Sequence, residues 1–83
     1  MTYKIQSSKE FESDFRKIDS SLQKRIKKKF LEVAKDPERY KRLHPPLQKY
    51  CRIWIEKLRI LFSYSIEKNI LYLEKIVFGH RYP

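Results

Sequence analysis

The spacing of apolar residues changes near the middle of this chain, and the change limits the folds that it can adopt. Between Phe11 and Val33, apolar residues recur every three or four positions, the period of a helix with one buried face. From Tyr50 onward this period disappears, and β-branched and aromatic residues become frequent, as is typical of strands. We therefore expect an α+β fold, with the helices packed on one face of an antiparallel sheet.

The first half is expected to contain a short strand and a helical hairpin. Residues 2–6 alternate as a strand does, and the pattern Ser7-x-x-Glu10 follows them directly. A second pattern, Ser20-x-x-Gln23, stands at the start of the next apolar stripe. Both are capping boxes, in which a hydroxyl and a carboxylate or amide satisfy the free amide groups of a helix start.

The second half is expected to form a three-strand antiparallel meander. Asp36-Pro37 ends the second helix, because the residue before a proline is pushed out of helical geometry. Residues 38–49 are predicted to form a loop. The expected strands are residues 50–55, 58–66 and 70–78, with turns at Glu56-Lys57 and at Glu67-Lys68-Asn69. The predicted order is β-α-α-β-β-β in a single domain, residues 1–83.

A two-residue turn at Glu56-Lys57 sets the register of the first hairpin and sorts its side chains by face. It places Trp54 opposite Arg59 and Arg52 opposite Leu61. The face expected to lie under the helices carries Cys51, Ile53, Ile55, Leu58, Ile60 and Phe62. The other, open face carries Tyr50, Arg52, Trp54 and Arg59. Guanidinium groups suit phosphate oxygens and aromatic rings stack on unpaired bases, so this face favours contact with single-stranded RNA. The alternative is a solvated face on which arginine stems cover Trp54.

The charge balance points to an acidic partner. The chain has 20 Lys and Arg against 10 Asp and Glu, a net charge of +10, and nine of the ten excess charges lie in residues 21–63. Such a field attracts polyanions, acidic proteins or anionic lipid heads, whereas solubility alone does not need so one-sided a balance.

Cysteine and histidine usage argues against a disulfide or a metal site. Cys51 is the single cysteine, and neither His44 nor His80 stands at a metal-ligand spacing from it or from the other. No signal peptide and no apolar run of spanning length are visible, so a reduced, cytoplasmic location without membrane or metal is expected. His80, near the end of the chain, could transfer protons near neutral pH, or it could belong to a frayed tail.

Three segments together resemble a known family. They are Tyr50-x-Arg52-Ile53-x-Ile55, Leu58-Arg59-Ile60-Leu61-Phe62 and Val77-Phe78-Gly79-His80-Arg81. They resemble the signature YRIRVG…YRVIYE…IGHR of the RelE/ParE toxins, and the helical hairpin, its basic second helix and the length match over nearly the whole chain. The resemblance implies a microbial toxin of a type II toxin–antitoxin pair. RelE-like members cleave messenger RNA in the ribosomal A site, where a ribose 2′-hydroxyl attacks the adjacent phosphate without metal or cofactor.

The resemblance also implies roles for individual residues. Arg59 matches the arginine that stabilises the charged phosphate, Arg81 the one assigned to the leaving group or transition-state charge, and Arg52 a basic residue that helps activate the nucleophile. His80 is the candidate acid or base. The residues expected to contact RNA are Lys49, Tyr50, Trp54 and Tyr82. Trp54 stands where many members have a second basic residue, and Tyr82 differs in register from the functional tyrosine of the family.

The expected partners are the ribosome, messenger RNA and an acidic, RelB-like antitoxin that folds across the basic surface. Two alternatives remain open. One is a ParE-like inhibitor of DNA gyrase that acts by protein contact, and the other is an RNA-binding homologue without activity. Three cations converging on one pocket, Arg52, Arg59 and Arg81, favour the nuclease, because an inhibitor acting by contact does not need them.

Overall fold

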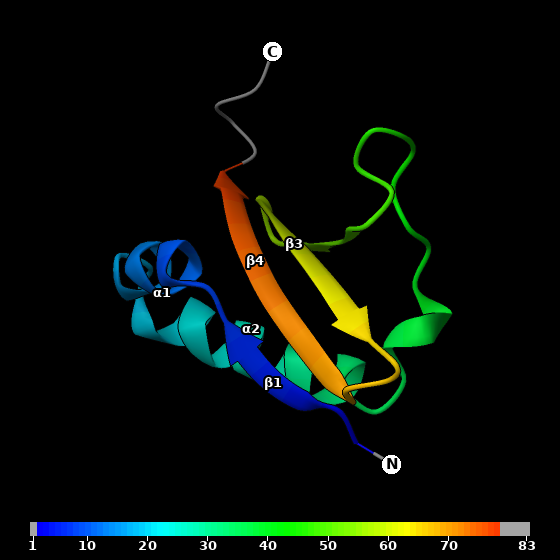
Figure 1. Ribbon diagram of the computed structural model, residues 1–83. Helices are drawn as coiled ribbons and strands as arrows, with labels where there is room; N and C mark the ends of the chain where they lie inside the picture. Colours follow the sequence, from blue (N-terminus) through cyan, green and yellow to red (C-terminus); the bar gives the residue numbers. More distant parts are fainter. Residues whose placement is uncertain (1, 79–83) are drawn as a thin grey trace.

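One four-stranded sheet with both helices on the same side forms the protein (Figure 1), in a computed structural model that describes residues 2–78. The elements, in chain order, are β1 (Lys4–Ser7), α1 (Lys9–Arg16), α2 (Ser20–Val33), the short 3₁₀ helix η1 (Pro37–Arg39), β2 (Cys51–Ile55), β3 (Leu58–Ser65) and β4 (Ile70–Phe78). The predicted α+β class and the order strand, helix, helix, meander are confirmed. None of the helices described is long and apolar enough to cross a bilayer.

The strands lie in the order β1-β4-β3-β2. β1 pairs in parallel with β4, while the two hairpins of the meander are antiparallel. β1 is therefore an edge strand of the sheet, and α1 follows it directly. The first strand therefore brings the start of α1 next to the middle of β4, where the Ser8 hydroxyl donates a hydrogen bond to the backbone oxygen of Glu74 at 2.8 Å.

The predicted register of the β2–β3 hairpin is confirmed at every pair. Trp54 lies opposite Arg59 and Arg52 opposite Leu61. The turn holds Glu56 at a φ of 56°, in the left-handed region that a residue with a Cβ seldom occupies. The apolar face that this register predicts is buried against the helices, apart from the half-buried Ile55.

The predicted N-cap of each helix is wrong by one residue. Ser8, not Ser7, caps α1, and its hydroxyl accepts from the Phe11 amide at 3.0 Å. Asp19, not Ser20, caps α2 and accepts from the Leu22 amide at 2.8 Å. Each site offers two adjacent residues that favour N-caps, so the spacing pattern alone does not choose between them. The end of α2 also differs, because the helix stops at Val33, before the Asp36-Pro37 pair.

Aromatic rings form the centre of the core, between α2, the sheet and the segment that follows η1. The ring of Phe62 on β3 is fully buried and meets Phe30 of α2 edge to face at 5.5 Å. It meets Tyr40, which follows η1, in the same manner at 5.8 Å. Burial of a phenylalanine of this kind contributes about 1.5–3 kcal/mol. Phe62 thus joins the helix layer, the sheet and the long loop before β2.

A β-bulge interrupts β4 where it passes β3. Leu61 pairs with Lys75 and Phe62 with Leu73, so Glu74 is the extra residue between two pairs. The bulge lets Leu73 and Ile76 both face the core although they stand three positions apart. Bulges re-aim side chains at functional edges of sheets. Here the bulged residue Glu74 joins the lining of a hollow on the open face.

Candidate functional site

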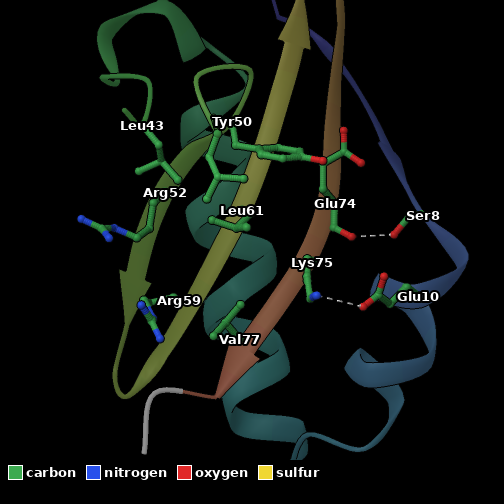
Figure 2. A pocket seen from close by; sticks show the side chains of 11 residues that line it. Ser8, Glu10, Leu43, Tyr50, Arg52, Arg59, Leu61, Glu74, Lys75 and Val77 are labelled. Atoms are coloured by element: carbon green, nitrogen blue, oxygen red, sulfur yellow. Dashed lines mark hydrogen bonds and ion pairs between the residues drawn. The ribbon is translucent and has the colours of Figure 1, made fainter. Parts of the chain in front are cut away.

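The open face of the sheet carries a cavity of about 560 Å³. It is lined by Ser8, Glu10, Leu43, Leu47, Tyr50, Arg52, Arg59, Leu61, Glu74, Lys75 and Val77. These residues come from four places in the fold, namely the β1–α1 junction, the loop before β2, and the open-face positions of β2–β3 and of β4. Figure 2 shows the two arginines on one side of the cavity and the acidic residues on the other, with Leu61 and Val77 between them.

Two arginines define the basic side. Arg52 of β2 is exposed, and Arg59 of β3 is half-buried. Trp54, paired with Arg59 across the hairpin, is 55% exposed, and its ring lies 5.2 Å from the Arg59 guanidinium carbon. A guanidinium held over an aromatic face is oriented by the cation–π attraction. The basic side therefore offers two guanidinium groups and an exposed ring that are close together.

The loop before β2 forms a wall of the cavity that the sequence did not predict. It contributes Leu43, Leu47 and Tyr50, and Figure 2 shows the Tyr50 ring reaching across toward Glu74. Lys49 does not line the cavity but places its ammonium group 5.0 Å from the Tyr50 ring centre. The wall combines apolar side chains with one aromatic ring, a surface suited to the flat face of a base.

Three contacts hold this loop against the sheet. The Arg42 guanidinium lies 4.8 Å from the ring centre of Tyr64, and a hydrogen bond to Tyr64 raises the pKa of Arg42. The Cys51 thiol donates to the Tyr40 backbone oxygen at 3.7 Å. The Tyr3 hydroxyl donates to Glu38 at 3.0 Å. Tyr64 lies on β3, Cys51 on β2 and Tyr3 just before β1, so these contacts hold the segment from η1 to β2 against the sheet.

Burial changes the acidity of two of these anchoring groups. It raises the pKa of the Cys51 thiol, which is almost completely buried, although the nearby Arg42 charge acts in the opposite direction. It also raises the pKa of Tyr3, with the hydrogen bond to the Glu38 carboxylate as the second cause. Both groups are therefore kept in the neutral, proton-donating form that their hydrogen bonds require.

The far side of the cavity is acidic, and sequence reasoning missed it. The Glu74 carboxylate accepts a hydrogen bond from the Ser63 hydroxyl at 2.7 Å, and Lys75 pairs with Glu10 at 3.7 Å. A signal was present in the sequence. Glu74 and Lys75 are two consecutive charged residues in a strand that is otherwise apolar or aromatic, and in a regular strand one of the two would face the core unless an extra residue is inserted.

The structure brings together part of the predicted site. Arg52, Arg59 and Tyr50 line one cavity, with Trp54 beside it and Lys49 against Tyr50. The remaining predicted residues, His80, Arg81 and Tyr82, lie outside the described residues, so their placement stays a prediction. Within residues 2–78, no group of three or more His, Cys, Asp or Glu side chains is arranged to hold a metal ion.

Comparison with known proteins adds a structural relationship without a sequence match. No family model and no curated protein matches the chain. Solved structures do match. The RelBE2 toxin–antitoxin complex of Mycobacterium tuberculosis aligns at a TM-score of 0.84 and 15% identity, over 94% of this chain and 99% of that one. The isolated RelE toxin of E. coli aligns at a TM-score of 0.79 and 21% identity, over 93% of this chain and 84% of that one. The archaeal RelE–RelB complex of Pyrococcus horikoshii aligns at a TM-score of 0.78 and 15% identity, over 99% of this chain and 100% of that one. Alignment over 84% or more of each structure, and over 93% or more of this chain, shows that this chain has the fold of the RelE toxins.

Proposed function

We propose that the protein is the toxin of a type II toxin–antitoxin pair and that it cleaves messenger RNA on the ribosome. The observation that carries the proposal is the pair of arginines, Arg52 and Arg59, beside an exposed tryptophan in an open-face cavity of a RelE-type fold. Fixed guanidinium groups bind phosphate oxygens in a forked geometry, and aromatic rings stack on splayed bases. A protein that acts on the ribosome works in the cytoplasm, which is where we place it.

The proposed reaction is transfer of the phosphoryl linkage from one ribose oxygen to another. The 2′-oxygen of a nucleotide attacks the adjacent phosphorus, the bond from phosphorus to the 5′-oxygen of the next nucleotide breaks, and a 2′,3′-cyclic phosphate and a 5′-hydroxyl remain. The 2′-hydroxyl loses a proton and the leaving 5′-oxygen gains one, so no other reactant is consumed. Negative charge develops on the phosphate oxygens in the transition state, and cations held in place stabilise it.

Each residue then has a proposed task. We assign Arg59, which Trp54 orients, to binding of the charged phosphate, and Arg52 to loss of the 2′-proton, which it would assist by stabilising the resulting oxyanion. Tyr50 and Trp54 offer rings for the bases on either side of the cleaved bond. By resemblance to the family signature, His80 donates the proton to the leaving oxygen and Arg81 adds a third positive charge.

An acidic antitoxin is the proposed protein partner. Two of the similar structures are complexes of a toxin with its antitoxin. This chain carries a net charge of +10, concentrated in residues 21–63. That segment includes all but the first residue of α2, the whole of β2 with Arg52, and most of β3 with Arg59. An acidic chain laid across it would neutralise the basic cavity and block access of RNA.

The test is primer extension on a message translated in a cell-free system. Wild type should produce cuts that depend on translation, and Arg59→Ala and Arg52→Ala should each lower the cleavage rate about a hundredfold or more. Lys68→Ala removes a comparable charge from the β3–β4 turn and should cleave as wild type does. Circular dichroism of each variant establishes that it is folded. If folded wild type leaves the translated message intact, the nuclease proposal is wrong, and a gyrase supercoiling assay then tests action by protein contact.

A further inference from the structure

The cavity is chemically divided, and one half of it does not suit a phosphate. Arg52 and Arg59 match a phosphate, but the Glu74 carboxylate on the opposite side would repel one. The second acidic residue of the lining, Glu10, is paired with Lys75, whereas no ion pair among the described residues involves Glu74. In a chain with a net charge of +10, a half-buried carboxylate on the proposed RNA face needs a different explanation.

The geometry of Glu74 leaves it able to accept further hydrogen bonds. A carboxylate has about four lone-pair sites, and the Ser63 hydroxyl occupies one of them at 2.7 Å. That bond also fixes the orientation of the side chain. The hydrogen bond that Ser8 donates goes to the Glu74 backbone oxygen, which any residue at this position would supply. The carboxyl group itself is therefore not required for the contact between β4 and α1.

The distance across the sheet corresponds to the length of one nucleotide. Arg52 pairs with Leu61, and Leu61 pairs with Lys75, the neighbour of Glu74. Two strand spacings, about 10 Å in total, separate Arg52 on β2 from the strand of Glu74, whereas Arg59 on β3 is one spacing from that strand and pairs with Val77. The phosphate of a nucleotide and the outer edge of its base are a comparable distance apart. Between them lie Leu61 and Val77, with Leu43, Leu47 and Tyr50 at the side, an apolar setting for a base.

We propose that Glu74 reads the base of the nucleotide whose phosphate the arginines bind, and that it selects guanine. The inference rests on the proposed RNA contact of this face. Guanine presents two adjacent N–H donors, N1–H and N2–H, which a carboxylate accepts together. Cytosine and adenine each present a single amino group beside a ring nitrogen acceptor. Uracil presents its one N–H between two carbonyl oxygens that repel a carboxylate, so it is the base most strongly rejected.

Binding of single nucleotides to the full chain measures this selectivity without requiring cleavage. Chemical shifts in NMR are followed while guanosine, adenosine, cytidine and uridine 3′-monophosphates are added in turn. For wild type, the guanosine nucleotide should bind about tenfold or more tightly than the uridine nucleotide, the discrimination expected of a paired hydrogen bond to a base. Amide signals of the Glu74–Lys75 strand should shift together with those of Arg52.

The decisive variant is Glu74→Gln, with Glu67→Gln in the exposed β3–β4 turn as its matched control. Glutamine keeps one acceptor and adds a donor, so the ratio of guanosine to uridine affinities should fall to near one, mainly because the uridine nucleotide binds better. The control should retain the wild-type ratio. Ser63→Ala, which frees the carboxylate to rotate, should lower the ratio only in part.

Two results would overturn the assignment. One is that wild type binds the guanosine and uridine nucleotides equally well, or binds neither. The other is a guanosine preference that survives in Glu74→Gln. Failure of this proposal can be told apart from failure of the proposed nuclease. If the protein selects guanosine through Glu74 but cuts no message, only the proposed cleavage is wrong. Conversely, if wild type and Glu74→Gln both cut messages with the same lack of preference for the A-site base, only the proposed selection of guanine is wrong.

Discussion

Replacement of Phe62 by alanine should be among the most destabilising single changes in this protein. Its ring is fully buried and meets Phe30 and Tyr40 edge to face, so the change removes two aromatic contacts and leaves a cavity between the helices and the sheet. Truncations of this kind cost about 3–5 kcal/mol, and two lost aromatic pairs put the expected loss near the upper end. A domain of 83 residues has a free energy of unfolding of roughly 4–12 kcal/mol, so Phe62→Ala should remove between about a third of that free energy and all of it.

The assay is urea unfolding followed by far-ultraviolet circular dichroism, with thermal unfolding beside it. A loss of about 4–5 kcal/mol corresponds to a fall in Tm of about 20 °C or more for a domain of this size. Ile66→Ala, whose side chain is 63% exposed, is the control and should change the free energy of unfolding by no more than about 0.5 kcal/mol. An unfolding midpoint of Phe62→Ala equal to that of the control would refute the view that this ring joins helix, sheet and loop.

Four further outcomes are expected. Removing the α2 cap in Asp19→Ala should lower the free energy of unfolding by about 0.5–2 kcal/mol, measured in urea, and no loss would mean that another group caps the helix. Because the pKa of Tyr3 is raised, its contribution to stability is complete below pH 10 and is lost as the pH rises through the folded-state pKa. The fall in the urea midpoint above pH 10 should therefore be smaller in Tyr3→Phe than in wild type, and equal falls would contradict this. Cys51 should react with a thiol reagent such as DTNB far more slowly in the folded protein than in urea, because the thiol is buried and its pKa is raised; equal rates would contradict its burial. Trp54→Ala should change the free energy of unfolding by about 1 kcal/mol or less but weaken binding of a single-stranded oligoribonucleotide by about 1–3 kcal/mol in a fluorescence anisotropy titration, and unchanged affinity would remove Trp54 from the RNA surface.

Local chemistry accounts for the parts of the fold that the sequence predicted correctly. The Glu56-Lys57 turn is short enough to fix one register, and one register decides the face of every side chain in the hairpin. Arg52, Trp54 and Arg59 were placed together on the open face for that reason. The helix caps were misplaced by one residue because two capping residues stand side by side at each helix start.

The parts that were not predicted depend on contacts between distant segments. The parallel pairing of β1 with β4 brings Lys4 beside Ile70, two residues from opposite ends of the chain, and no local pattern encodes it. The loop wall of the cavity is held by Arg42 against Tyr64 and by Tyr40 against Phe62, pairs separated by about twenty residues along the chain. Glu74 is different, because two adjacent charged residues in an otherwise apolar or aromatic strand do indicate a bulge.

The most direct test of the central proposal removes a single oxygen atom from the RNA. Ribosomes are programmed with a message whose A-site codon carries 2′-deoxyribose at the nucleotide on the 5′ side of the cut, and single-turnover cleavage by wild type is compared with that of the all-ribose message. Because the 2′-oxygen is the proposed nucleophile, we predict that the all-ribose message is cut to a 2′,3′-cyclic phosphate and a 5′-hydroxyl while the substituted message stays intact. Cleavage of both messages at the same rate would contradict the proposed reaction.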